Sequence, residues 1–424
     1  MKELKRILDA TSGISAYRIS ENSRNSYELF FVHEYLETVR STDTVDTDVT
    51  VYVEHDGAIG DSTFHVYASM TEDDIKEKIK TAASRAMLVS NQPYTLPEGG
   101  QLEAELPTDL DKYEPEQLGK MIADAVFSAD HEEGCSINAL EIFIYKDTAR
   151  VVNSRGVDKK QTSFRVMIEA IPTFTDGDDS VELYEDYRFT EFNAEKLRAE
   201  IAEKMKEVAD RAKAVKPEGG MTVNVLLRPH EISELLYELS RDCNYQTIYS
   251  HANLHSVGDK LQNGDCDRLN VTMKAVVEGS ERSAFFDEDG ASLHDTVIIR
   301  DGEVCGSFGT TRFGQYLGVK EPSGSLRCAS VGAGTLEDEQ IKEKPYLDVV
   351  SMSGLQLDLY NDYIGGEIRL AYLFDGEKTT PVTGISMSAK LSEALDTMRL
   401  SRKTDVNGPY EGPVRLLLKD ITVL

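Results

Sequence analysis

Several features that would indicate a familiar class of protein are scarce or missing in this sequence of 424 residues. Cysteine occurs five times and never in a CxxC pair, so neither a disulfide framework nor a zinc ribbon is expected, and the thiols are predicted to be reduced and buried. No stretch approaches the roughly twenty apolar residues that span a bilayer. The charged start, Met1–Ala10, lacks the apolar segment of a signal peptide. These absences predict a soluble, cytoplasmic protein.

Positively charged residues are also scarce relative to negatively charged ones. The chain has 75 acidic and 46 basic residues, which gives a formal net charge of −29. Such a field repels phosphate backbones, and no run of lysine and arginine is long enough to reverse it locally. We therefore expect no direct binding to nucleic acid.

What is present is ordinary globular composition, with 40% hydrophobic and 29% charged residues. A long helix is predicted from the cap at Asn193, and Pro217, Gly219 and Gly220 end it sharply. We place a domain boundary there, between residues 1–218 and 219–424. The alternating strand and helix signals predict an α+β fold. Its amino-terminal α/β-type domain combines helices with a mixed or antiparallel sheet, and its carboxy-terminal domain is largely antiparallel β.

Polar runs inside the apolar pattern of the first half indicate turns. Glu21–Asn25 is predicted to separate a strand at Ile14–Ser20 from one at Ser26–Val39. Lys146–Thr148 is predicted to turn the chain after the strand Leu140–Ile144. The sequence therefore predicts short strands.

Helices and one hairpin have stronger signals. Thr71 and Asp74 form a capping box before a helix, and Pro115 is suited to the first position of another. After the boundary, a buried strand at Thr222–Leu227 leads into a short helix whose apolar side chains face inward. Asp375-Gly376 predicts a type I′ hairpin turn.

Seven segments in a characteristic order resemble the TldD/PmbA family, also called modulators of DNA gyrase. These segments are the strand pair in Val49–Ala68, the turn Asn153–Gly156, the long helix before Gly219-Gly220, Phe286–Gly290, Gly354-Leu355, Asp362–Gly366, and Gly384–Ser388. Ser388 stands where the family usually has asparagine. Within this set, Asp287–Asp289 is expected to be a solvated acidic turn, a cation site there being the weaker alternative.

The resemblance implies a two-domain protein that forms dimers. In the family, a zinc-bearing TldD-type subunit pairs with a zinc-free PmbA-type (TldE) subunit, and the complex cuts or matures small peptides and unfolded segments. Catalytic members carry H-E-x-x-x-H on the helix after the first strand of the second half. Here that position reads His230-Glu231, with Leu235 in place of the second histidine.

The motif is therefore degenerate. A zinc peptidase needs about three protein ligands and a carboxylate base, and leucine has no lone pair to offer. The cysteine that the family resemblance also leads us to expect has no counterpart in Asp405–Pro413. We predict no catalytic residue and no cofactor in this chain, and we expect zinc in a TldD-type partner.

Two alternatives stay open. His230 and Glu234 share a helical face at i, i+4 spacing, and His251 and His255 have the same spacing on a nearby segment. Together these four residues could form an unrelated metal site in a metallohydrolase. The chain could also be a stand-alone peptide-binding homodimer. The leading prediction is a non-catalytic subunit that positions peptide for a zinc subunit.

Overall fold

The computed structural model describes residues 1–337, 340 and 345–424. Its first eight strands form one sheet, in the order β3-β2-β1-β5-β6-β4, with β7 and β8 also paired to β6. The strands are β1 (Ala16–Val32), β2 (Tyr35–His55), β3 (Ala58–Val66), β4 (Gln101–Glu105), β5 (Cys135–Asn153), β6 (Asp158–Asp176), β7 (Asp179–Glu182) and β8 (Glu185–Phe189). The β4–β6 pair is parallel and the other pairs are antiparallel, so the expected mixed sheet is confirmed.

Helices pack on this sheet at its two ends. The helices of the first half are α1 (Lys2–Asp9), α2 (Glu72–Ala86), the 3₁₀ turn η1 (Leu110–Lys112), α3 (Pro115–Phe127) and α4 (Ala194–Lys213). One apolar cluster joins α1 and α2 to β1–β3, and a second joins α3 and α4 to β1, β5 and β6. The predicted capping box at Thr71 and the Asn193 cap are both formed.

The predicted turns at Glu21–Asn25 and Lys146–Thr148 are wrong. Both segments lie inside long strands, because β1 continues for 17 residues and β5 for 19. The polar stretches fall between the two helix-covered clusters, where the strands have no apolar layer to contact. Their backbone groups are satisfied by neighbouring strands, with Asn22 opposite Asp46 on one side and Ala149 on the other.

Two further sheets form the second half. A six-stranded sheet has the order β12-β11-β10-β13-β21-β20. An eight-stranded sheet has the order β14-β9-β22-β18-β16-β15, with β17 paired to β16, β19 paired to β22, and β14 also paired to β16. The strands are β9 (Met221–Leu227), β10 (Val271–Lys274), β11 (Thr296–Arg300), β12 (Glu303–Val304), β13 (Cys328–Val331), β14 (Tyr346–Met352), β15 (Gln356–Asp358), β16 (Tyr363–Phe374), β17 (Thr379–Val382), β18 (Ile385–Lys390), β19 (Arg399–Leu400), β20 (Thr404–Asn407), β21 (Tyr410–Pro413) and β22 (Leu416–Val423). The helices are α5 (Pro229–Asp242), α6 (Tyr245–Tyr249), α7 (Thr311–Tyr316) and α9 (Leu391–Thr397).

The predicted hairpin between β16 and β17 is confirmed, but its turn type is wrong. Gly376 has a positive φ of 106°, whereas Asp375 is not among the residues with positive φ, as a type I′ turn would require. Asp375 instead accepts hydrogen bonds from the backbone of Glu377 and Lys378.

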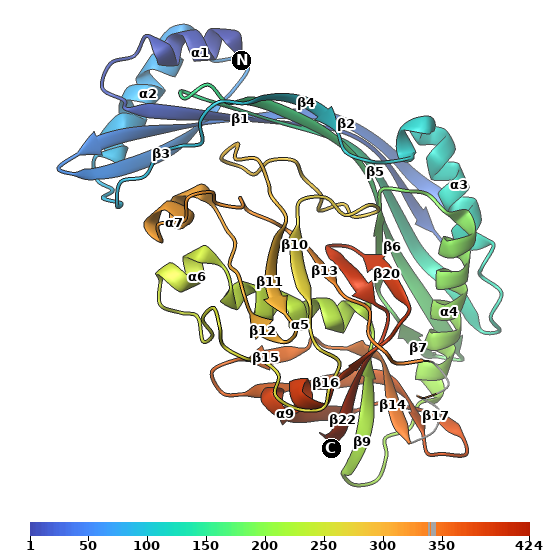
Figure 1. Cartoon of the computed structure of the whole chain (residues 1–424). Coiled ribbons are helices and arrows are strands. Elements are labelled where there is room, and N and C mark those ends of the chain that lie inside the picture. The colour runs from blue at the N-terminus through green and yellow to red at the C-terminus, as the bar shows by residue number, and fades with distance from the viewer. Residues whose placement is uncertain (338–339, 341–344) are drawn as a thin grey trace.

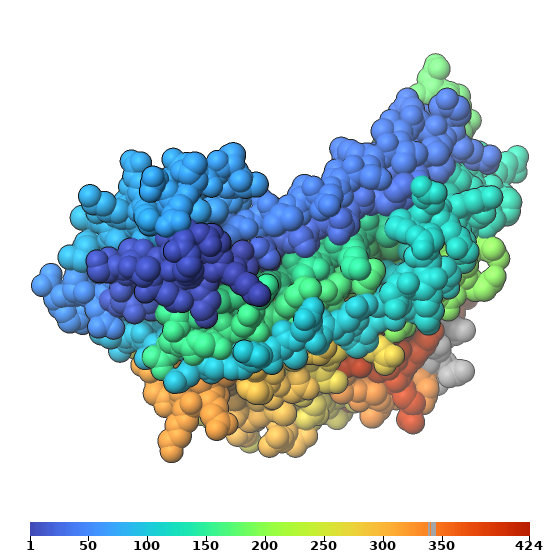
Figure 2. Space-filling model, turned by 90° about the horizontal axis from the view of Figure 1, so that it is seen from above, coloured from blue at the N-terminus to red at the C-terminus, as the bar shows by residue number. Residues whose placement is uncertain are grey.

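The first sheet arches over the second half and covers it with its concave face, while α3 and α4 lie on the outer side (Figure 1). Seen from above, the first half forms a broad cover, with the second half emerging along one side (Figure 2). The predicted boundary at residues 218/219 lies between α4 and β9 and stays a prediction. In the part of the chain that is described, no helix is both long and apolar enough to cross a membrane.

Buried polar contacts connect the two halves. Asp287, expected in a solvated turn, is only 5% exposed, so that prediction is wrong. It accepts hydrogen bonds from the backbone of Asp289, Ala291 and Ser325, while Asp289 itself pairs with Arg18 of β1. Nearby, Lys159 Nζ donates to Gly290 O and Ser292 Oγ, each at 2.8 Å. These contacts of the loop fix the first sheet against the second half.

Candidate functional site

The degenerate motif lies on α5, directly after strand β9. Pro229 occupies the first turn of the helix, where its missing N–H costs nothing. One stripe of side chains packs in the core of the second half, as predicted. These are Ile232, Leu235, Leu236 and Leu239.

The motif residues point in different directions. His230 is exposed, with 75% of its side chain accessible, and its Nε2 lies 3.7 Å from Glu234 Oε1. Leu235 is 1% exposed and belongs to the core. Five residues along an α-helix correspond to a rotation of about 140°, and in this chain the two side chains lie on different faces of α5.

Glu231 is the second residue of the motif, and its environment is unusual for a carboxylate. It is 3% exposed, and its Oε2 has no hydrogen-bond partner within the described residues. Burial is the main cause that raises the pKa of this carboxyl above its ordinary value. In a zinc peptidase the carboxylate base acts on a metal-bound water, and the buried Leu235 provides no ligand for the metal. These residues do not fit a zinc site.

The alternative metal-site residues are not brought together. His255 Nδ1 lies 2.9 Å from Asp242 Oδ2, and Asp242 also accepts from the backbone of Leu254. Asp242 ends α5, about 18 Å along the helix axis from His230. His251 is exposed in the loop after α6, with a φ of 54°. Among the described residues, no group of three or more His, Cys, Asp or Glu side chains is placed to hold a metal ion.

Glu234 has a structural role that the sequence did not indicate. Its Oε2 accepts a hydrogen bond of 3.0 Å from the backbone N–H of Leu355, immediately before β15. This contact fixes the start of β15 against the exposed face of α5.

A cavity of about 570 Å³ lies along that face. Its lining comes from α5, from the start of β15, and from the turn after β20; the residues are His230, Ser233, Glu234, Tyr237, Glu238, Leu355, Gln356, Leu357, Asn407 and Pro409. Both β15 and β20 are terminal strands of their sheets, so each has one edge whose N–H and C=O groups are not used by a neighbouring strand. The cavity is thus lined by residues of two terminal strands.

This cavity is the end of a longer groove under the arched sheet. It shares His230, Asn407 and Pro409 with a cavity of about 770 Å³ bounded by β8 and α4. That cavity shares Arg188, Glu281 and Arg282 with one of about 360 Å³, which shares Gln161 and Ser163 with a fourth of about 320 Å³. We call this series the interface groove.

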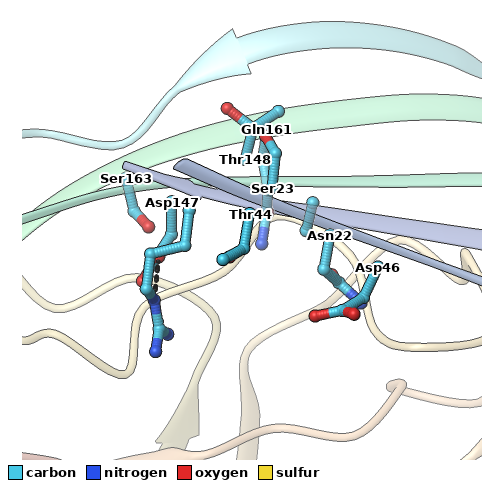
Figure 3. A pocket seen from close by; sticks show the side chains of 10 residues that line it. Asn22, Ser23, Thr44, Asp46, Asp147, Thr148, Gln161 and Ser163 are labelled. Atoms are coloured by element: carbon cyan, nitrogen blue, oxygen red, sulfur yellow. Dashed lines mark hydrogen bonds and ion pairs between the residues drawn. The ribbon is translucent and has the colours of Figure 1, made fainter. Parts of the chain in front are cut away.

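Polar side chains line the far end of the interface groove. In Figure 3, Asn22, Asp46 and Ser163 project from the strands of the first sheet toward the loops of the second half. No motif in the sequence identifies these residues, because they come from separate strands. The one signal for them in the sequence is the polar run Glu21–Asn25, whose composition predicts a turn instead.

Buried ion pairs hold α5 against α4 beside the groove. Arg228 Nη1 lies 2.6 Å from Glu207 Oε1, and Arg228 Nη2 lies 3.2 Å from Asp348 Oδ2. Lys204 Nζ in turn contacts Glu207 at 2.9 Å and Glu185 at 3.2 Å. Burial raises the pKa of Glu185, although Lys204 acts against that shift. The network fixes the start of α5 relative to the first half.

Comparison with known proteins adds to this geometry. Residues 220–424 match the family described as PmbA/TldA metallopeptidase C-terminal domain. No curated protein sequence matches the chain.

Three solved structures share the fold over the whole chain. A putative modulator of DNA gyrase from Thermotoga maritima is 15% identical, with 100% of both chains covered and a TM-score of 0.80.

The other two structures agree with the first. TldE from Thermococcus kodakarensis is 14% identical, with 100% of this chain and 99% of that chain covered and a TM-score of 0.80. A putative modulator of DNA gyrase from Bacteroides thetaiotaomicron is 16% identical, with 100% and 98% covered and a TM-score of 0.81. At these identities the likeness establishes the fold, and the matched family describes the carboxy-terminal half.

Proposed function

Since its carboxy-terminal half makes this chain a member of the metallopeptidase-related PmbA/TldD family, we propose that it is a non-catalytic, TldE-like subunit that holds peptide for a zinc-bearing TldD-type subunit. The complex would process or degrade peptides and unfolded segments. We further propose that it acts in the cytoplasm, where the five free cysteines would remain reduced.

One observation carries this proposal. The side chain at the position of the family's second zinc-binding histidine is Leu235, which is 1% exposed in the apolar core. Leucine has no atom that binds zinc, so a rotation of this side chain would not restore the missing ligand. The chain nevertheless keeps an accessible groove beside α5. A site that retains a groove but lacks zinc ligands suits a subunit that binds substrate without cutting it.

The shape of the groove supports an extended peptide as its occupant. At the α5 end, the edges of β15 and β20 offer unused backbone groups that can accept a further strand. Backbone pairing of this kind tolerates many side-chain sequences, which suits unfolded segments as substrates.

A binding experiment tests the subunit role. The tagged chain is used to capture partners from an extract of its own cells, and captured proteins are identified by mass spectrometry. We expect a partner with an intact H-E-x-x-x-H motif, and peptidase activity in the captured complex. Recovery of the chain without such a partner would contradict the proposal.

A stand-alone peptide-binding homodimer is the second candidate. It is favoured by the fact that the interface groove is formed within a single chain. Light scattering on the purified chain, together with a search of its genome for a TldD-type gene, separates the two. A homodimer in a genome without that gene would support the second candidate. A metallohydrolase with a rebuilt metal site is not favoured, since His230 and His255 lie at opposite ends of α5.

A further inference from the structure

Four guanidinium groups surround one cavity of the interface groove. The cavity of about 360 Å³ between β6, β8 and two loops of the second half is lined by Arg165, Arg188, Arg282 and Arg327, with Glu281 as its single lining carboxylate. We call it the arginine chamber. Among the lining side chains, four cationic groups thus face one carboxylate, in a chain whose formal net charge is −29.

Two of these arginines have open hydrogen-bonding groups. Arg188 contacts Asp186 through Nε at 2.6 Å, and Arg282 contacts Glu281 through Nε at 3.0 Å. The terminal nitrogens of both side chains donate no hydrogen bond to any described residue. Arg guanidinium groups bind carboxylates through two parallel N–H···O bonds, so each has the donors for an incoming ligand.

Each arginine of the chamber has an acidic partner; these partners are Asp147 for Arg165, Asp186 for Arg188, Glu281 for Arg282 and Glu288 for Arg327. Glu281 is 6% exposed and is shared between Arg282 and Arg165, whose Nη1 lies 3.8 Å away. Arg327 contacts Glu288 at 3.3 Å, with both side chains more than half exposed. Exposed pairs of this kind contribute only about 0–1 kcal/mol, so Arg327 can exchange its partner at little cost.

The adjoining cavity has the opposite charge. Along β8 and α4 it is lined by eight carboxylates against five cationic side chains, and it leads to α5. The groove therefore changes from basic to acidic toward the degenerate site. An extended chain with a negative group at one end would be oriented by this change.

We propose that the arginine chamber binds a carboxylate of the peptide held in the interface groove, an inference that rests on the proposed function. Either the carboxyl terminus or an acidic side chain can supply this group. In both cases the chamber sets the direction of the peptide along the groove.

The test uses the full-length chain and an octapeptide of alternating valine and threonine with an uncharged coumarin at its amino terminus. Three forms are compared by fluorescence anisotropy: a free carboxyl terminus, a terminal amide, and a terminal amide with glutamate at the penultimate position. We expect the amide to bind about tenfold more weakly than the free acid, a loss of about 1.4 kcal/mol, because the charge-assisted hydrogen bonds to the carboxylate are lost. If the glutamate restores affinity, a side chain is an accepted source; if it does not, the carboxyl terminus is the source.

A double substitution, Arg188→Gln with Arg282→Gln, should remove the preference for the acid, so that the acid and the amide bind with equal affinity. Arg300→Gln, at an exposed position on β11, is the matched control and should keep the preference. Equal affinity for acid and amide in the wild-type chain would overturn the chamber proposal alone. Failure to bind any of the three peptides would overturn the peptide-binding function and the chamber with it.

Discussion

Leu235 and Glu231 show how a metal motif can survive in sequence and be lost in structure. Leu235 contributes to the core that α5 shares with the sheets of the second half. Glu231 keeps the residue type of a catalytic base, yet it is buried with one oxygen lacking a partner. Burial raises the pKa of this carboxyl, because the charged form is held away from water.

Replacement of Leu235 by histidine should not recreate a zinc site. The new side chain would enter the core, so we expect the variant to lose about 2–4 kcal/mol of stability without gaining zinc. Urea unfolding and elemental analysis measure the two effects. Tyr237→Ala, at a 67% exposed position on the same helix, is the control and should change stability by less than about 0.5 kcal/mol. One bound zinc in the histidine variant would show that Leu235 alone prevents metal binding.

Asp287 should impose a pH dependence on stability. Burial, with the neighbouring charges of Asp289 and Glu288, raises its pKa from 3.8 to about 6 in the folded chain. A raised carboxyl pKa means that the folded state holds the proton more tightly. Its stabilising contribution is therefore complete below about pH 4 and is lost as the pH rises to about 6.

Comparison with Asp287→Asn isolates this contribution. The variant loses acceptors for backbone N–H groups, so it should be less stable than the wild type at every pH. The difference in unfolding free energy between the wild type and the variant should narrow by roughly 1–3 kcal/mol as the pH rises from 4 to 6. Urea unfolding at intervals across that range measures it, and a constant difference would mean that the pKa of Asp287 is not raised.

At the level of elements, the helices were more predictable than the long strands. Thr71 and Asn193 mark helix starts through local hydrogen bonds, which depend on neighbours within three residues. The continuation of β1 through Glu21–Asn25 depends instead on pairing with β2 and β5, whose partners are about 24 and 127 residues away in sequence. Single-sequence patterns do not contain that information. The groove was missed for the same reason, since its lining is assembled from distant segments.

The continuity of β1 can be tested at Ser23. This residue pairs with Val45 of β2 and Thr148 of β5, so proline there would remove a backbone donor from an inner strand. We expect Ser23→Pro to destabilise the chain by about 3 kcal/mol or more. Ser23→Thr should be tolerated. If thermal unfolding shows the proline variant to be as stable as the wild type, the segment is a turn, as the sequence pattern alone indicated.

The strand edges beside α5 lead to a prediction about the ligand. If peptide adds as a strand to β15 or β20, methylation of alternate peptide nitrogens should weaken binding about tenfold, since several backbone hydrogen bonds are lost. The same fluorescence anisotropy assay measures it. Methylated and unmethylated peptides of equal affinity would indicate recognition through side chains.

At the scale of the whole molecule, the groove exists because the arched sheet is fixed over the second half. Lys159 is a central contact, with two hydrogen bonds of 2.8 Å to the loop that carries Asp287. Burial lowers its pKa, and the nearby Asp287 opposes that shift. The two halves should therefore unfold together.

Lys159→Met tests this connection. The variant loses two hydrogen bonds from a charged donor across the interface, so we expect a loss of about 2–4 kcal/mol and easier proteolysis between the halves. The matched control is Lys160→Met on the same strand, where the side chain is 40% exposed and pairs with Glu103. Its effect should stay below about 1 kcal/mol. Equal effects of both substitutions in urea unfolding would contradict a special role for Lys159.

The central claim is that this chain binds substrate for a zinc subunit and holds no catalytic zinc itself. The most direct test is the zinc content of the full-length chain, purified alone without chelator and measured by mass spectrometry after gel filtration. We predict no stoichiometric zinc, because Leu235 lies in the core and His230 and His255 lie at opposite ends of α5. About one zinc per chain would contradict the account and assign catalysis to this subunit.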